Sequence, residues 1–413
     1  MAGLSSAWML NRAGFAVTVF EKGPKPGLAA NSQDFAPYFS GLDSPLAGDV
    51  PSRMFNDSLW PAVTKLYRES GIEFEPVDHQ QSFANGGEVL IKIGLPYLTS
   101  GLKNMLNPVA RRLLASLSKF QKAGLESLRN GSAHSQTFGQ FVEQWQGEER
   151  ESEFLDCFLY PALTSTVFTC PTADLQNYPC GLVLNALKSI ANVDSPLNRT
   201  VNGSAHAASL LLLDIEDIRF GTAVENVSTS SESATVYAGG EAWDFEHVIV
   251  ATQANHASRL VADALPEESR LLSNFRYVDV PIVVHFDESV LPRRKNDWRT
   301  FNFEARAKKS ACTVWMNRFH KGWPTETNLF HSIFPHEHID DRKIISSDTL
   351  QRPIVNATTS GLHQALHKTH LQDRRVWFVG SYASPGVPLL ESAVQSSNTV
   401  VQKLISILTS ASV

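Results

Sequence analysis

The sequence predicts an α/β protein in which both ends of the chain contribute to one nucleotide-binding domain, while the middle forms much of a second, α+β domain. Three observations predict this fold. The chain opens with a small-residue turn, a helix and an apolar strand, MAGLSSAWMLNRAGFAVTVFEK. It closes with a strand, a glycine turn and a helix, RRVWFVGSYASPG followed by PLLESAVQSSNTVVQKLISIL. Helical and β-rich segments lie between these ends, which implies a discontinuous architecture.

Composition narrows the class of protein. The 413 residues, 43% of them hydrophobic, suffice for two buried cores. A net charge of −6 gives no basic surface for nucleic acid, and no apolar run is long enough for a membrane span. The N-terminus does not resemble a signal peptide, so we expect a cytoplasmic protein. The cysteines show no metal-ligand spacing and are expected to be free thiols: Cys157, Cys170, Cys180 and Cys312.

The opening elements follow from residue spacing. Apolar residues at near-helical spacing predict a helix over residues 4–12, and Gly14 is placed to end it. The run FAVTVF is β-branched and aromatic, as in a strand of a parallel sheet that is covered on both faces. A loop rich in Gly, Pro, Ser and Asp follows, from residue 23 to about residue 51.

The middle of the chain, about residues 58–190, is predicted to be mostly helical. The segments LWPAVTKLYRES, NPVARRLLASLSKFQKAGLESL and FGQFVEQWQ all carry apolar residues three and four apart. The second of these is amphipathic and basic, which leaves two interpretations open. It is either a bundle helix with a solvated face, which we favour, or a helix for a membrane surface or a substrate entrance.

The β-rich regions lie mainly in the second half. The stretch IRFGTAVENVSTSSESATVYAGGEAWDFEHVIVATQ predicts three short strands with polar turns and then an apolar strand. A further β-rich region runs over residues 277–286 and through ACTVWMN. No internal repeat or low-complexity segment interrupts this pattern.

The chemistry is carried by the opening segment and two later ones. A dinucleotide fingerprint needs three small residues in the first turn and an acid at the end of the second strand. Here Gly3 matches the third small residue, and Glu21 is placed to accept hydrogen bonds from ribose hydroxyls. The segment around Val224 and Ala251-Thr252-Gln253, and the closing turn at Gly380, match two further cofactor segments in the same order.

On these segments the chain resembles the flavin-containing amine oxidoreductase family, and especially a branch known as predicted NAD/FAD-binding proteins. YPALTSTVFTCP, NGSAHA, TVWMNRFHKGWPTETNLF and the segment LPRRKNDW extend the resemblance along the chain. Several features depart from the pattern: the first strand, the first two glycines, the usual RxGG and the proline of ATP. We therefore expect an N-terminally truncated chain.

The resemblance implies a Rossmann-like FAD-binding domain and an α+β substrate domain of the amine oxidase/phytoene desaturase type. The expected FAD-binding domain comprises residues 1–57, 196–262 and 370–413, and the substrate domain 58–195 and 263–369. FAD would be held non-covalently, with no metal site. The expected cofactor contacts are Gly3, Glu21, Lys22, Val224, Ala251, Thr252, Gly380, Ser381 and Leu390.

Three functions remain open. The chain is an FAD-dependent oxidoreductase that removes a hydride from a small or lipid-like substrate, a flavin-dependent fatty-acyl or polyene desaturase or isomerase, or a cofactor-poor binding or regulatory relative. No acid–base pair identifies catalytic residues, and the oligomeric state is open. The histidines are scattered along the chain: His79, His256, His285, His320 and His331. Four residues in branch-specific stretches could line the substrate domain: Asp287, Trp298, Trp315 and Asn317. For both tryptophans, core packing is an equal alternative.

Overall fold

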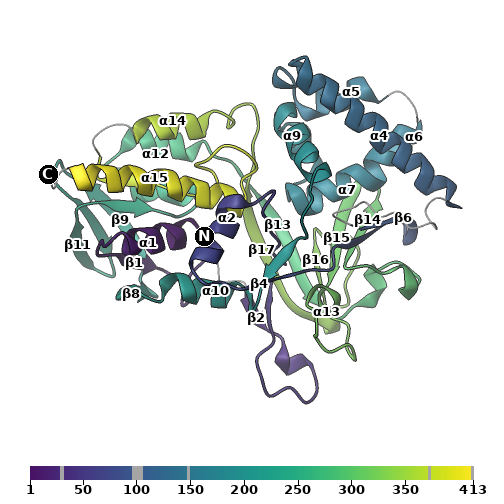
Figure 1. Cartoon of the computed structure of the whole chain (residues 1–413), viewed down its shortest axis with the longest axis horizontal. Helices are drawn as coiled ribbons and strands as arrows, with labels where there is room; N and C mark the ends of the chain where they lie inside the picture. Colours follow the sequence, from purple (N-terminus) through teal and green to yellow (C-terminus); the bar gives the residue numbers. More distant parts are fainter. Residues whose placement is uncertain (28–31, 95–105, 147–148, 371–373, 411–413) are drawn as a thin grey trace.

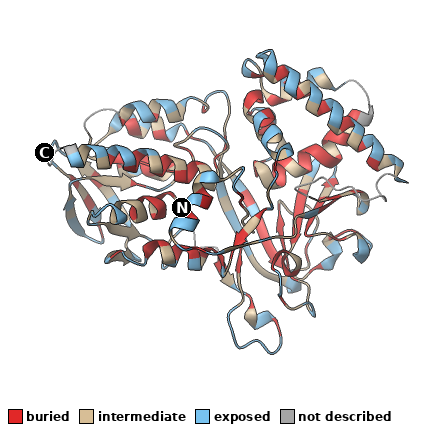
Figure 2. Cartoon of the chain, viewed as in Figure 1, coloured by how far each residue is buried: buried red, intermediate tan, exposed pale blue. Residues whose placement is uncertain are grey.

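The computed structural model describes residues 1–27, 32–94, 106–146, 149–370 and 374–410. Figure 1 shows two lobes side by side. One lobe contains α1, α15, β1, β8, β9 and β11, and the other contains the large sheet covered by helices. Figure 2 shows that buried residues concentrate on the sheets and on the inner faces of the helices. The predicted α/β fold class is confirmed.

The first lobe contains two parallel strand pairs. β1 (Thr18–Glu21) pairs with β8 (Asp217–Phe220), and β12 (Val248–Val250) pairs with β18 (Val376–Phe378). Helix α1 (Ala2–Arg12) packs against both pairs, because Leu4 shares a core with Val19 while Ala2 shares another with Trp377. Within the described residues, β1 and β18 each have a ladder partner on one side only.

The other predicted elements of this lobe are also present. β9 (Val224–Thr229), β10 (Ala234–Ala238) and β11 (Glu241–Phe245) form the expected antiparallel meander. The closing helix α15 (Leu390–Ser410) packs along α1, and Ser397 Oγ donates a hydrogen bond of 2.8 Å to the carbonyl of Ala2. Gly14 follows α1 with a φ of 87°, which is the left-handed conformation that favours glycine at a helix end.

The second lobe is built on a seven-stranded mixed sheet. Its strand order is β17–β13–β16–β15–β14–β5–β6. The strands are β17 (Ile344–Pro353), β13 (Tyr277–His285), β16 (Phe330–Ile333), β15 (Lys309–Trp315), β14 (Phe301–Arg306), β5 (Gln80–Asn85) and β6 (Glu88–Gly94). The β13 and β15 regions match the prediction. The β5–β6 hairpin was missed inside the helical middle, although Gly86 and Gly87 supply its positive-φ turn.

Helices cover one side of this sheet. Two predicted helices are present here as α4 (Pro108–Arg129) and α5 (Phe138–Trp145), and a third, α2 (Pro61–Glu69), is present but packs against the first lobe. α4 buries Leu113 and Phe120 in the largest core, and Arg112 on its outer face pairs with Glu153. This packing supports the bundle-helix interpretation. Further helices of this lobe are α6 (Glu149–Phe154), α7 (Tyr160–Ala162), α8 (Thr172–Gln176), α9 (Cys180–Ala191) and α13 (Met316–Phe319). None of the described helices is long and apolar enough to cross a membrane.

Short elements connect the lobes. They are β2 (Ser32–Asp34) with β3 (Ala47–Asp49), β4 (Phe74–Pro76) with β7 (Asn198–Thr200), and α10 (Gly203–Leu212). α2 packs in one core with α1, and α12 (Pro266–Ser273) and α14 (Leu362–Thr369) pack in another with β12 and β18. The predicted domain boundaries at residues 58 and 263 stay a prediction. All four cysteines are buried free thiols.

Candidate functional site

The carboxyl ends of the strands in the first lobe bring several predicted cofactor residues to one region. Glu21 ends β1, and its Oε1 accepts a hydrogen bond of 2.8 Å from the backbone of Gly23. The turn after β8 is tied to it, because Thr222 N donates to the carbonyl of Glu21 at 3.0 Å. Val224 follows two residues later as the first residue of β9. Glu21 and Val224 therefore belong to one local assembly, as ligand sites at parallel strand ends require.

The end of β12 meets the first turn of α1. A Cβ built on Gly3 would lie 3.0 Å from the Cβ of Ala251, so a larger side chain here would push the helix away from the strand. Ala251 and Thr252 are exposed, and Thr252 Oγ1 donates a hydrogen bond to the neighbouring Gln253 carbonyl. The exposed Lys22 acts on the start of α11 (Ala254–Leu260). The pKa of His256 on that helix is lowered mainly by burial of the ring and next by the charge of Lys22.

The C-terminal segment contributes the remaining predicted contacts. Gly380 is buried after β18, and its N–H donates to Ser396 Oγ at 3.0 Å. A Cβ at this position would overlap the ring of Tyr382, so the turn requires glycine. Leu390 begins α15 and packs in the core shared with Leu4 of α1. Gly380, Ser381 and Leu390 thus form a second group, joined to α1 through α15.

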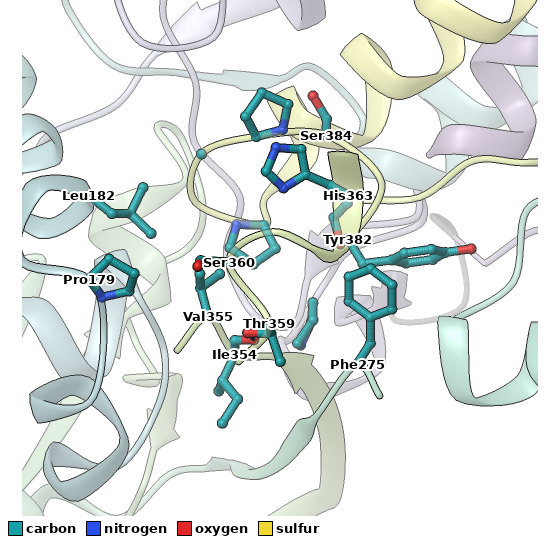
Figure 3. A pocket seen from close by; sticks show the side chains of 15 residues that line it. Pro179, Leu182, Phe275, Ile354, Val355, Thr359, Ser360, His363, Tyr382 and Ser384 are labelled. Atoms are coloured by element: carbon teal, nitrogen blue, oxygen red, sulfur yellow. Dashed lines mark hydrogen bonds between the residues drawn. The ribbon is translucent and has the colours of Figure 1, made fainter. Parts of the chain in front are cut away.

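A pocket of about 170 Å³ lies beside this turn. In Figure 3, Pro179 and Leu182 lie on one side of the pocket, and Phe275 and Tyr382 lie on the other. Ser381, a predicted cofactor contact, also lines the pocket. The lining is mainly apolar, with a few polar groups such as Ser360, His363 and Ser384, which is the usual character of a small-molecule site.

Comparisons with known proteins decide the family. A family model described as flavin-containing amine oxidoreductase matches residues 1–405. The chain belongs to this family. No curated protein matches in a sequence search. The family assignment confirms the predicted oxidoreductase class and a flavin as its cofactor.

Solved structures confirm the fold. Cyclohexylamine oxidase from Brevibacterium oxydans IH-35A has a TM-score of 0.66 at 13% identity, covering 99% of this chain and 97% of that one. Putrescine oxidase bound to putrescine has a TM-score of 0.67 at 12% identity, covering 98% and 97%. A CLA-producing fatty acid isomerase from P. acnes has a TM-score of 0.67 at 11% identity, covering 97% and 96%.

The residues present fit the flavin dinucleotide of this amine oxidoreductase family. Glu21 keeps one carboxylate oxygen without a hydrogen bond to the described residues, as a ribose acceptor needs. The N-terminus of α1 has no side-chain cap and no acid in its first turn, so its amides suit a pyrophosphate. Gly380 itself allows the ring of Tyr382 to pack against the turn that follows β18, and Ser381 next to it lines the pocket.

The branch-specific residues proposed for the substrate domain have internal roles. Asp287 is buried and accepts hydrogen bonds from Asp340 N and from Lys343, which holds two loops together. Asn317 donates to the carbonyls of Pro324 and Thr327. Trp298 is buried against Trp315 and Phe330, which favours the core-packing alternative for it. Trp315 is half-buried, and its ring N–H finds no partner among the residues that the structure describes.

A connection that the sequence analysis missed runs through Asp49. Its carboxylate accepts hydrogen bonds from Ser32 Oγ at 2.6 Å and from the backbone N and Oγ of Ser204 at the start of α10. Arg53 donates to Ser204 Oγ at 2.8 Å. The only sequence signals were an acid near the end of the loop and the NGSAHA motif, and Asp49 and Ser204 lie 155 residues apart. Asp49 thus fixes residues 48–53 against the first lobe.

Proposed function

We propose that this chain binds FAD non-covalently and uses it to remove a hydride from a small or lipid-like substrate. The observation that carries the proposal is that α1, whose uncapped N-terminus suits a pyrophosphate, packs against β1, which ends at Glu21, and against α15, while the turn before α15 lies beside a pocket that reaches the second lobe. When bound, the flavin supplies the hydride-accepting chemistry. The chain supplies binding, orientation and exclusion of water.

The chain's own residues define how the groups would be held. Glu21 would accept the adenosine ribose hydroxyls, with Val224 beside the adenine and Lys22, Ala251 and Thr252 around the strand ends. Gly3 would allow close packing of α1, and Gly380, Ser381 and Leu390 would hold the ribityl side. The apolar lining, including Leu182, Phe275 and Ile354, would exclude water from the substrate.

A second candidate is desaturation or isomerisation of an apolar chain. The lining of the pocket favours this candidate over an amine. The described residues that form the lining include no Asp, Glu, Lys or Arg, so no carboxylate is there to pair with an ammonium group. The two aromatic residues of that lining, Phe275 and Tyr382, pack against each other with ring centroids 5.0 Å apart. Substrate identity therefore separates the candidates, whereas both need the same cofactor site.

The test is FAD binding by the purified chain. We expect a yellow protein, and we expect Glu21→Gln to raise the Kd for FAD about tenfold, because a charge-assisted hydrogen bond contributes about 1.5–3 kcal/mol. Absorbance titration measures both. Glu232→Gln, in the exposed turn between β9 and β10, is the matched control and should leave the Kd unchanged. A colourless protein that cannot be reconstituted would contradict the proposal and favour a cofactor-poor binding role.

A further inference from the structure

Three buried polar side chains, two on the second lobe and one on the connecting strand β7, have nitrogens without a hydrogen-bond partner among the described residues. We call Arg199, His320 and His331 the donor cluster; their exposed fractions are 9%, 2% and 1%. No hydrogen bond from the part of the chain that the structure describes reaches Arg199 Nε, His331 Nδ1 or either ring nitrogen of His320. Arg199 and His331 both add to the effect of burial in lowering the pKa of His320, so each lies within electrostatic range of that ring. Buried polar groups are normally paired, so this cluster requires an explanation.

The cluster lies against the segment of residues 48–53. Trp323 stacks on His320 with ring centroids 4.0 Å apart and an interplanar angle of 11°. The far edge of Trp323 rests on Gly48, where a Cβ would lie 2.8 Å from the indole. Ser52 lies against His331, with Oγ 2.9 Å from Nε2. This segment is held by Asp49 on the first lobe, so the donor cluster faces the junction of the lobes.

The hydrogen bonds of His331 determine its tautomer. The backbone N–H of Ser52 can only donate, and it points to His331 Nε2 at 3.2 Å. Nε2 therefore accepts, and the ring hydrogen is on Nδ1. Burial lowers the pKa of His331 to about 3, so the ring is neutral at neutral pH. His331 Nδ1 is thus an unused donor.

Arg199 adds a second unused donor and a positive charge. Its terminal nitrogens are engaged, one with Glu75 Oε1 at 2.5 Å and one with the carbonyl of Thr200 at 3.2 Å. Its Nε always carries a hydrogen. His320, neutral because burial and its two charged or polar neighbours lower its pKa, offers one donor and one acceptor. The cluster therefore presents three hydrogens and one acceptor.

We propose that the donor cluster binds an oxygen acceptor of the substrate, a carboxylate or a carbonyl group. The proposal rests on the proposed function, since it names the polar end of that substrate. An acceptor oxygen would satisfy donors that otherwise remain unpaired, each at a cost of about 1–3 kcal/mol. An ammonium group brings only hydrogens and meets a guanidinium, so the cluster selects against amines.

The experiment compares three probes with one ring and different polar ends. Calorimetric titration of the FAD-loaded protein with benzoate, benzamide and benzylamine should show binding of the first two and no binding of the third. Acetate serves as a smaller carboxylate probe. The titrations are repeated on protein without FAD, because a carbonyl oxygen of the flavin could occupy the donor cluster in place of the probe. If bound FAD itself occupies the cluster, benzoate will bind only the FAD-free protein, and the proposal fails.

Two substitutions of one residue sharpen the test. His331→Gln keeps a group near Nε2 and loses the Nδ1 donor, so benzoate should bind about tenfold more weakly. His331→Asn places an amide N–H near Nδ1 and should keep affinity within about threefold. His206→Gln, exposed on α10, is the control. Flavin absorbance reports cofactor loading for each variant, so a failure of the proposed function is seen separately. Equal benzoate affinity in wild type and His331→Gln, tighter binding of benzylamine, or no binding of either carboxylate would overturn the proposal.

Discussion

Two buried histidines on adjacent strands of the large sheet have opposite environments. His285 on β13 is fully buried, and both ring nitrogens are bonded, Nδ1 to Asp287 N at 3.1 Å and Nε2 to Ser332 Oγ at 2.9 Å. Ser332 continues to Thr313 Oγ1 at 2.7 Å. His331, the neighbour of Ser332 on β16, points to the opposite face and has one nitrogen unpaired.

The different hydrogen bonding of the two histidines distinguishes a structural histidine from one available to bind a ligand. A closed network such as that of His285 satisfies every donor and acceptor within the protein, so it contributes to stability and needs no ligand. The donor cluster around His331 leaves donors open on the face that meets the segment of residues 48–53. The same residue type, at similar burial, thus has a structural role on one face and a binding role on the other.

The largest effect should come from breaking the closed network. His285→Leu leaves Asp287 N without its partner in the interior and removes one of the two partners of Ser332 Oγ, which keeps Thr313, and we expect the free energy of unfolding to fall by about 2–4 kcal/mol. Urea unfolding measures the change. His206→Leu, on the exposed face of α10, should change it by less than about 0.5 kcal/mol. A loss below about 1 kcal/mol for His285→Leu would mean that the network contributes little.

Sequence reasoning reached the first lobe better than the donor cluster, for a physical reason. Backbone groups dominate the expected cofactor site, and Gly3, Glu21 and Gly380 occur in local patterns of strand, turn and helix. The donor cluster joins Arg199, His320 and His331 from separate segments, and no periodicity indicates which histidine is buried without a partner. Both histidines from the cluster were noted only as scattered residues.

The same limit applies to the fold. Long periodic segments such as α4 and β13 were predictable because each carries its own pattern of burial. The β5–β6 hairpin was not, because β5 is an internal strand whose register is set by β14, more than 200 residues later in the chain. The two turn glycines are present in the sequence, but the helical patterns on either side led to a helical prediction for the whole region.

A second prediction uses pH. His331 has a folded pKa of about 3, lowered by burial and then by His285, against an ordinary value of 6.5. Between these values the unfolded chain binds a proton that the folded chain does not, so stability is lost as pH falls below 6.5. His331→Gln removes this contribution. From pH 6 to 4.5 we expect the variant to lose about 2 kcal/mol less than wild type.

Urea unfolding at several pH values measures that difference. Other groups near the ring, including His285, His320 and Arg199, remain in both proteins, so their contributions largely cancel in the comparison. Parallel pH profiles for wild type and His331→Gln would contradict the neutral state of His331, and with it the assignment of the ring hydrogen to an unused donor.

The smallest effect on stability should come from the least-bonded residue. His320 makes no hydrogen bond through its ring, and its main contact is the stack on Trp323. His320→Phe keeps an aromatic ring there and removes two unpaired nitrogens, so we expect the free energy of unfolding to change by less than about 1 kcal/mol. His320→Ala, which also removes the stack, should cost more.

Benzoate affinity should fall in His320→Phe even though stability does not, because a residue retained for binding rather than for folding can be replaced without unfolding the protein. A loss of more than about 2 kcal/mol on His320→Phe would instead place His320 with His285 among the structural histidines.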